Sequence, residues 1–248
     1  MTLRLGQAGV RALVLDIEGT TTPVSFVYET LFPYARQHLH EYIARNGSSP
    51  DHAALLQRFR DEHDADSRID RSVPSWHDDP AAALASLEAY AIWLMDRDRK
   101  STALKELQGL IWESGYRSGA LEGAVFPDVA PALGRWRHAG VPVAIFSSGS
   151  VFAQKLLFEF STAGNLTPFI ASYFDTTTGP KAEPGSYRRI ASAMQLPSSS
   201  VLFISDVPRE LDAADAAGTQ IALAVRPGNA PVDDDRYQAI RSFDELLE

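Results

Sequence analysis

Short aliphatic runs recur along the chain, and helical patterns separate the later ones. Four runs are nearly continuous: residues 11–16, 141–146, 201–205 and 220–225, reading RALVLD, VPVAIF, VLFIS and QIALAV. Runs of this kind are typical of strands buried on both faces. The helical patterns between them open at Ser150 or close at Pro197 and Gly218. This alternation predicts an α/β fold with a parallel sheet that helices cover on both faces.

Residues 24–123 have a different pattern, in which one helical signal follows another without a buried strand. The segment 32–47 ends at Asn46 and Gly47, a common helix stop. A second helix begins after Asp79, and a third, within 101–115, carries an apolar face. The polar stretch 61–79 is interpreted as a loop. We therefore expect an all-helical domain, 24–123, inserted into a core domain made of 1–23 and 124–248.

Composition narrows the function classes. Thirty-two acidic residues against 23 basic ones give a formal net charge of −9, which repels nucleic acid. The chain has no cysteine, so disulfides and thiolate chemistry are excluded, and no stretch reaches the about 18 apolar residues of a membrane span. We expect a cytoplasmic enzyme that binds neither nucleic acid nor membrane.

Polar residues with chemical potential follow several predicted strands. Asp16 and Glu18 follow the first strand, Ser147 and Ser148 the second, and Asp206 the third. In a parallel sheet, the carboxyl ends of the strands line the crevice where ligands bind. Lys181 precedes a helix in the connection between two of these strands. The topology therefore predicts that these side chains meet in one pocket.

Such a set fits chemistry on a phosphate ester. The carboxylate of Asp16 can attack phosphorus if a cation offsets the repulsion between this carboxylate and the negatively charged phosphate. Asp16, Glu18 and Asp206 offer the hard oxygen ligands that Mg²⁺ prefers. Ser148 and the amides that open the next helix can hold phosphoryl oxygens, with Lys181 as a fixed positive charge. Glu18 can then protonate the leaving oxygen and later activate water.

The motifs resemble a known family. The order D-x-E-G-T, S-S-G-S, G-x-K and S-D-x-x-x-E is similar to that of the haloacid dehalogenase superfamily of phosphohydrolases. The stretches DIEGTTTPVSFV, SSGSVFAQKLLF and SDVPRELDAA look most like its enolase-phosphatase E1 family, which acts in methionine salvage. The likeness covers nearly the whole chain. It implies a Rossmann-like three-layer core, with the helical insertion in the place of a cap domain.

The resemblance also implies roles for single residues. Asp16 would be nucleophile and metal ligand, Glu18 the acid/base and a metal ligand, and Asp206 a metal ligand for one Mg²⁺ per subunit. Ser147, Ser148 and Lys181 would bind the substrate, and Lys181 would also assist catalysis. Most members of the superfamily carry Asp where this chain has Glu18, whereas enolase-phosphatases share the Glu. Whether Glu18 binds Mg²⁺ by carboxylate or by backbone stays open.

The implied reaction is the conversion of 2,3-diketo-5-methylthiopentyl 1-phosphate to 1,2-dihydroxy-3-keto-5-methylthiopentene, an acireductone, and phosphate. The implied enzyme is a monomeric phosphoric monoester hydrolase. The main alternative is a phosphatase of another small ester without enolase activity. Two other classes fit less well: receiver modules lack so large a helical insertion, and in a metal-free dehalogenase the carboxylates of Glu18 and Asp206 would repel that of Asp16. Two further acids are left unassigned, since Glu210 and Asp212 fit either a supporting role or an exposed helix surface.

Overall fold

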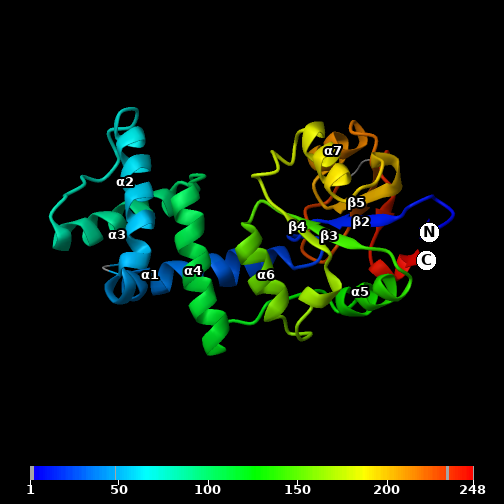
Figure 1. Ribbon diagram of the computed structural model, residues 1–248, viewed down its shortest axis with the longest axis horizontal. Coiled ribbons are helices and arrows are strands. Elements are labelled where there is room, and N and C mark those ends of the chain that lie inside the picture. Colours follow the sequence, from blue (N-terminus) through cyan, green and yellow to red (C-terminus); the bar gives the residue numbers. More distant parts are fainter. Residues whose placement is uncertain (1–2, 48, 233–234, 248) are drawn as a thin grey trace. The chain divides into compact units, whose positions relative to one another are not determined.

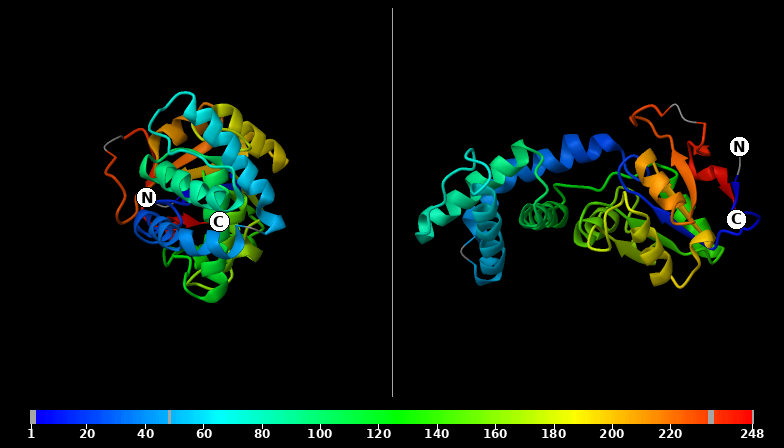
Figure 2. Two further views of the ribbon diagram at one scale, coloured as in Figure 1. Left: turned by 90° about the vertical axis from the view of Figure 1, so that its left-hand side faces the viewer. Right: turned by 90° about the horizontal axis from the view of Figure 1, so that it is seen from above.

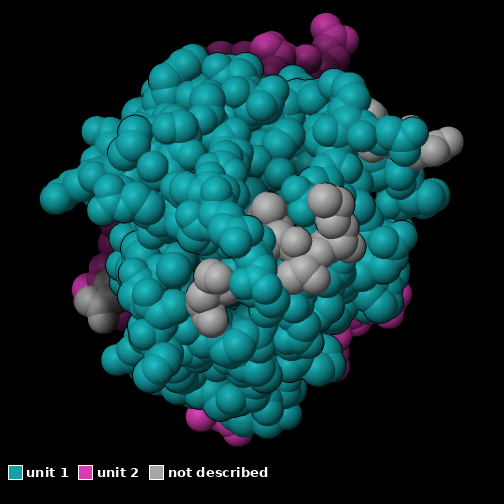
Figure 3. Space-filling view, turned by 90° about the vertical axis from the view of Figure 1, so that its right-hand side faces the viewer, with its two compact units in different colours: residues 1–28, 119–248 teal, residues 29–118 magenta. Residues whose placement is uncertain are grey.

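The computed structural model describes residues 3–47, 49–232 and 235–247. The chain divides into two compact units, coloured separately in Figure 3. One unit is Met1–Tyr28 with Gly119–Glu248, and the other is Glu29–Ser118. The first carries the β-sheet and the second is built from helices. That the helical unit acts as a cap stays a prediction.

A parallel sheet forms the centre of the first unit, which confirms the predicted fold class. Within the described residues its strand order is β4-β3-β2-β5-β6-β7. Their bounds are β2 Ala12–Leu15, β3 Val143–Phe146, β4 Ser172–Phe174, β5 Val201–Ser205, β6 Gln220–Ala224 and β7 Ala239–Ile240. Two further strands, β1 Leu3–Arg4 and β8 Leu246–Leu247, pair with each other side by side (Figure 2). The sequence patterns predict β2, β3, β5 and β6, but they miss β4 and β7, which are only three and two residues long.

Helices cover both faces of this sheet (Figure 1). Their bounds are α5 Val129–His138, α6 Val151–Glu159, α7 Pro184–Ala193 and α8 Pro208–Asp215. On one face, Phe146 and Phe203 of the strands pack with Tyr187 of α7 and Leu211 of α8 in a buried hydrophobic cluster. Burial of such side chains stabilises the fold by about 1.5–3 kcal/mol each. The strand ends are therefore fixed in a rigid frame.

The predicted start of α6 is confirmed in detail. Ser150 Oγ accepts a hydrogen bond from the backbone N–H of Ala153 at 3.2 Å, which satisfies one of the orphan donors of the first turn. The helix thus begins directly after the S-S-G-S motif. Its position keeps the loop 147–150 at the carboxyl end of β3.

The second unit contains α1 Phe32–Asn46, α2 Ala53–Ser67, α3 Pro80–Asp96 and α4 Thr102–Ser118. The interpretation of 61–79 as a loop is wrong for its first seven residues, because α2 extends through them. Leu55, Phe59 and His63 recur every four residues and are buried, which marks one helix face. Most residues between these three positions are polar, so the composition of the segment does not reveal the helix.

Short helical turns complete the chain: the π-helix η1 Phe26–Leu31 and the 3₁₀ helices η2 Pro50–His52, η3 Thr167–Phe169, η4 Ser198–Ser200 and η5 Phe243–Glu245. In the described part of the chain, no helix combines the length and the apolar character needed to cross a bilayer.

Candidate active site

A polar cleft of about 240 Å³ lies at the carboxyl ends of the strands of the first unit. It is lined by Asp16, Glu18, Val24, Tyr28, Ser147, Ser148, Lys181, Asp206, Val207 and Glu210. Every site residue predicted from the sequence is in this set. These residues are up to 194 positions apart in sequence (16 to 210), so the parallel topology is what brings them together.

Lys181 is the centre of the charged groups in this cleft. Its Nζ lies 2.6 Å from Oδ1 of Asp16 and 2.6 Å from Oε2 of Glu210. Burial alone would lower the pKa of Lys181, but the two carboxylates outweigh it and raise the pKa. The hydroxyl of Tyr187 donates to the Lys181 backbone carbonyl at 2.6 Å, which fixes the base of the side chain. Lys181 is therefore a permanent cation beside Asp16.

Glu210 belongs to the site, although the sequence left its role open. Ser205 Oγ donates to its Oε2 at 3.0 Å and lies 3.4 Å from Oδ2 of Asp16. Burial, followed by the charge of Asp16, raises the pKa of Glu210 to about 7. One signal was present in the sequence: Glu210 lies in the first turn of α8, which begins two residues after Asp206 and therefore starts at the strand ends. Asp212, by contrast, is exposed and pairs with Arg236.

Asp206 lies against the turn that follows β2. Burial and the charge of Asp16 raise its pKa to about 6. At Gly19 (φ +67°), an added Cβ would come within 2.2 Å of Asp206 Oδ2. The turn after Asp16 therefore requires glycine at position 19 for two reasons: the backbone there is left-handed, and the Asp206 carboxylate leaves no room for a side chain.

The donor set of the cleft fits a divalent cation. Asp16, Glu18, Asp206 and Glu210 face a single lysine among the described residues that line it. Burial, and after it the charge of Asp16, raises the pKa values of Asp206 and Glu210, so a cation placed among these acids would offset a cost of keeping them ionised. Within the described residues, no three acidic or imidazole groups are gathered closely enough to hold an ion by themselves. Mg²⁺ commonly takes only one or two carboxylates and completes its shell with water and substrate oxygens.

The serines occupy the other wall of the cleft. Ser147 is buried, its N–H donates to the Phe174 carbonyl at 3.2 Å, and its Oγ accepts from Gly149 N at 3.2 Å. Ser148 is exposed to the cleft. Ser147 thus stabilises the conformation of the loop. Ser148 lies beside the N-terminus of α6, where an anion binds favourably.

The loop after β6 is a further part of the site that the sequence analysis missed. Asn229 Nδ2 donates to the Gly19 carbonyl at 2.9 Å, and Arg226 Nε donates to the Thr20 carbonyl at 3.1 Å. The signal was available, because β6 was predicted as a strand of the same sheet and its carboxyl end opens into the polar sequence RPGN (226–229). The sequence analysis considered mainly acidic and hydroxyl side chains and therefore did not include this loop.

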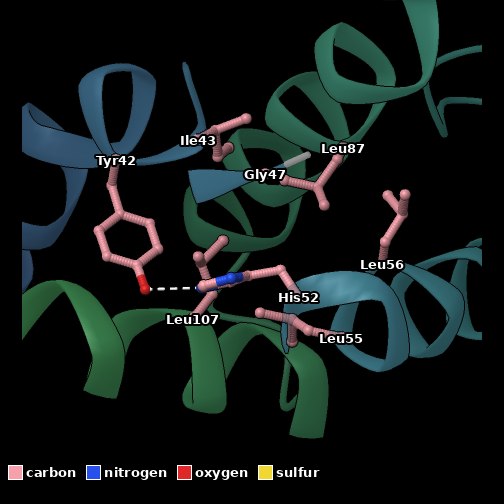
Figure 4. Close-up of a pocket in the computed structure, with 8 residues that line it drawn as sticks. All are labelled: Tyr42, Ile43, Gly47, His52, Leu55, Leu56, Leu87 and Leu107. Carbon is pink, nitrogen blue, oxygen red and sulfur yellow. Dashed lines mark hydrogen bonds between the residues drawn. The ribbon is translucent and has the colours of Figure 1, made fainter. Parts of the chain in front are cut away.

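A second, apolar pocket lies wholly within the helical unit (Figure 4). There Tyr42 OH and His52 Nε2 are 2.8 Å apart, and leucines from α2, α3 and α4 surround them. Its volume of about 10 Å³ accommodates about one water molecule. It is a packing gap rather than a substrate site.

Comparison with known proteins agrees with the fold and the cleft. The haloacid dehalogenase-like hydrolase family matches residues 10–218. Enolase-phosphatase E1 of Synechococcus elongatus is 50% identical over 237 residues, covering 96% of this chain and 98% of the relative. The protein of the same name from Salmo salar is 40% identical and covers 96% and 95%.

Solved structures show the same architecture. The UTR4 protein of Saccharomyces cerevisiae superposes with a TM-score of 0.78 at 36% identity, covering 95% of this chain and 99% of that one. A dehalogenase with 20% identity and a TM-score of 0.53 shares the fold alone. The residues matched by the family model, 10–218, span both units and all positions of the polar cleft. This chain therefore belongs to the enolase-phosphatase E1 family of the haloacid dehalogenase-like hydrolases.

Proposed function

We propose that this enzyme is a Mg²⁺-dependent enolase-phosphatase that converts 2,3-diketo-5-methylthiopentyl 1-phosphate to the acireductone and phosphate. The observation that carries the proposal is the meeting of Asp16, Lys181 and the acids 18, 206 and 210 in one cleft. Near full-length similarity to enolase-phosphatases supports the choice of substrate. The proposal includes a monomeric, cytoplasmic enzyme.

Asp16 is the proposed nucleophile. Lys181 holds Oδ1 at 2.6 Å, and Ser205 lies 3.4 Å from Oδ2, so the carboxylate is fixed in one orientation at the end of β2. A carboxylate oxygen attacks phosphorus, the bond between phosphorus and the ester oxygen breaks, and an aspartyl-phosphate forms. Ser148 and the N-terminus of α6 bind the phosphoryl oxygens during this transfer.

Glu18 is the proposed proton donor and acceptor. It is two residues from Asp16, and both line the same cleft. In the first half-reaction it gives a proton to the leaving oxygen, and in the second it takes one from the water that cleaves the aspartyl-phosphate. The second step restores Asp16 and Glu18 to their starting states.

Asp16, Glu18 and Asp206 are the proposed Mg²⁺ ligands, Asp16 and Asp206 through their carboxylates and Glu18 through its backbone carbonyl, which leaves the Glu18 carboxyl group able to carry a proton. When bound, Mg²⁺ supplies the positive charge that offsets the repulsion between Asp16 and the phosphate, and it can polarise a carbonyl of the diketone for enolisation. Lys181 remains as a second positive charge on the phosphate side.

A direct assay tests the proposal. The wild-type enzyme receives the diketo phosphate with and without Mg²⁺, and phosphate release and the ultraviolet absorbance of the enediol are followed. We expect both signals with Mg²⁺, neither in Asp206→Asn, and both in Asp215→Asn, a control at an exposed position of α8, the helix that follows Asp206. Phosphate release without the absorbance change would instead indicate a phosphatase without enolase activity. Absence of both signals from folded wild-type enzyme would overturn the proposal.

A further inference from the structure

Two side-chain amides hold the two loops that form the cleft. Gln154 of α6 donates through Nε2 to the carbonyls of Gly149 and Phe174, at 2.8 and 2.9 Å. Asn229, after β6, donates through Nδ2 to the carbonyls of Gly19 and Ala224, at 2.9 and 3.1 Å. Each amide therefore links one carbonyl of a cleft loop to one carbonyl at the end of a sheet strand.

The pairing of donors and acceptors explains why amides occupy these positions. A buried backbone carbonyl must find a donor, and a loop has no neighbouring strand to provide one. A side-chain NH₂ group has two N–H bonds and can serve two carbonyls together. Both amide oxygens, Oε1 of Gln154 and Oδ1 of Asn229, are buried and accept no hydrogen bond from the described residues. The orientation of each amide is thus fixed by its two donated bonds.

The two loops have different proposed tasks. Asn229 holds the turn after Asp16, at the point where Gly19 lies against Asp206. Gln154 holds the loop of Ser147 and Ser148 against the end of β4. The first loop carries Asp16 and Glu18, two of the three proposed metal ligands, and packs against the third, Asp206. The second loop carries the proposed phosphate contacts.

We propose that Asn229 and Gln154 are positioning residues with separate tasks, Asn229 for the cation and Gln154 for the phosphoryl group. The inference rests on the proposed function for the roles of the two loops. Neither amide touches the reacting atoms. Each acts by keeping a loop in its binding conformation before the ligand arrives, which preserves affinity.

The chain contains a matched control. Gln220 also donates through Nε2 to two carbonyls, those of Ala8 and Ser199, at 2.9 and 2.8 Å. It begins β6 at the amino end of the sheet, opposite the cleft. Replacing Gln220 removes the same chemical link without touching either loop of the cleft.

The experiment compares Asn229→Leu, Gln154→Met and Gln220→Leu, each confirmed as folded by circular dichroism. Mn²⁺ binding is titrated on substrate-free protein, and the inhibition constant of inorganic phosphate and the Mg²⁺ concentration for half-maximal phosphate release are measured. We expect Asn229→Leu to weaken cation binding about tenfold or more, with phosphate inhibition changed less than about twofold. We expect Gln154→Met to weaken phosphate binding about tenfold and to leave cation binding within about twofold. Gln220→Leu should change neither.

Equal effects of the first two variants on both ligands, or no effect of either, would overturn the inference. Where a Leu or Met variant fails to fold, Asn229→Ala or Gln154→Ala, which adds no apolar atoms, replaces it in the same measurements. Failure of the proposed function is distinguishable, because the wild-type enzyme would then release no phosphate with Mg²⁺, while the Mn²⁺ titration would still separate the variants.

Discussion

The ammonium group of Lys181 lies 2.6 Å from Asp16 and 2.6 Å from Glu210, and all three side chains are at most 15% exposed. One cation thus serves two buried carboxylates. Its contact with Asp16 leaves Oδ2 facing Ser205, and its contact with Glu210 anchors it to α8. Lys181 is held on both sides, which fixes its charge next to the proposed nucleophile.

Replacement of Lys181 should abolish most of the activity. Lys181→Met removes the fixed charge beside Asp16 and the phosphate, so we expect kcat/KM for phosphate release to fall by about 100-fold or more. Lys155→Met is the control, because Lys155 is exposed and lies over the ring of Tyr173. Steady-state kinetics measure both variants. A decrease of less than about tenfold in Lys181→Met would exclude a catalytic role for this lysine.

Gly19 should tolerate no side chain. Gly19→Ala places a methyl group against the Asp206 carboxylate and, at φ +67°, strains the backbone by about 1–2 kcal/mol. Gly9→Ala has a similar φ of +72° but open space around it. We expect both variants to lose stability in urea unfolding, and only Gly19→Ala to lose Mg²⁺-dependent activity. Retention of full activity in Gly19→Ala would contradict the close approach of Gly19 and Asp206.

The stability of the metal-free protein should depend on pH through Glu210. Its pKa of about 7 in the folded protein exceeds the ordinary value of 4.5 for a glutamate, so its protonated form is favoured on folding. This contribution is complete below about pH 4.5 and is lost as pH rises through 7. The stability of wild type relative to Glu210→Gln should therefore fall by on the order of 2 kcal/mol between pH 4.5 and 8. Urea unfolding without divalent cations measures it, and a difference that rises with pH would refute the assignment.

Arg226 should be a major stabilising residue of the core unit. Its guanidinium is 2.7 Å from Asp128 and stacks on the rings of Phe126 and Phe243. Arg226→Met leaves the Asp128 charge buried, and we expect a loss of about 3–5 kcal/mol in chemical unfolding. Arg135→Met breaks a more exposed pair with Asp244 and should lose about 0–1 kcal/mol. Equal losses of unfolding free energy in the two variants would show that burial does not determine how much each ion pair contributes to stability.

The sequence predicted the parts of the fold that repeat a simple pattern. The runs that became β2, β3, β5 and β6 are continuous and apolar, and Ser150 caps α6 as expected. Helix α2 was not predicted, because its buried face is narrow and polar residues surround that face. Parallel strand ends share one edge of a sheet, so the meeting of Asp16, Lys181 and Asp206 in one cleft was also predictable.

What could not be predicted depends on contacts between side chains and distant backbone. The link from Asn229 to Gly19 spans 210 residues, and no local pattern encodes it. The position of Glu210 in the first turn after Asp206 is compatible with a place in the site, but it is equally compatible with an exposed helical acid. Its contact with Lys181 follows only from how α8 lies over the sheet.

The central claim is that Asp16 is the nucleophile, and trapping the phosphoenzyme tests it most directly. Wild-type protein is mixed with the diketo phosphate and Mg²⁺, quenched in acid within the first turnovers, digested and analysed by mass spectrometry. The account predicts one phosphoryl group on Asp16 itself, absent in Asp16→Asn and without Mg²⁺. Turnover with a phosphoryl group on another residue, or full activity in Asp16→Asn, would contradict it.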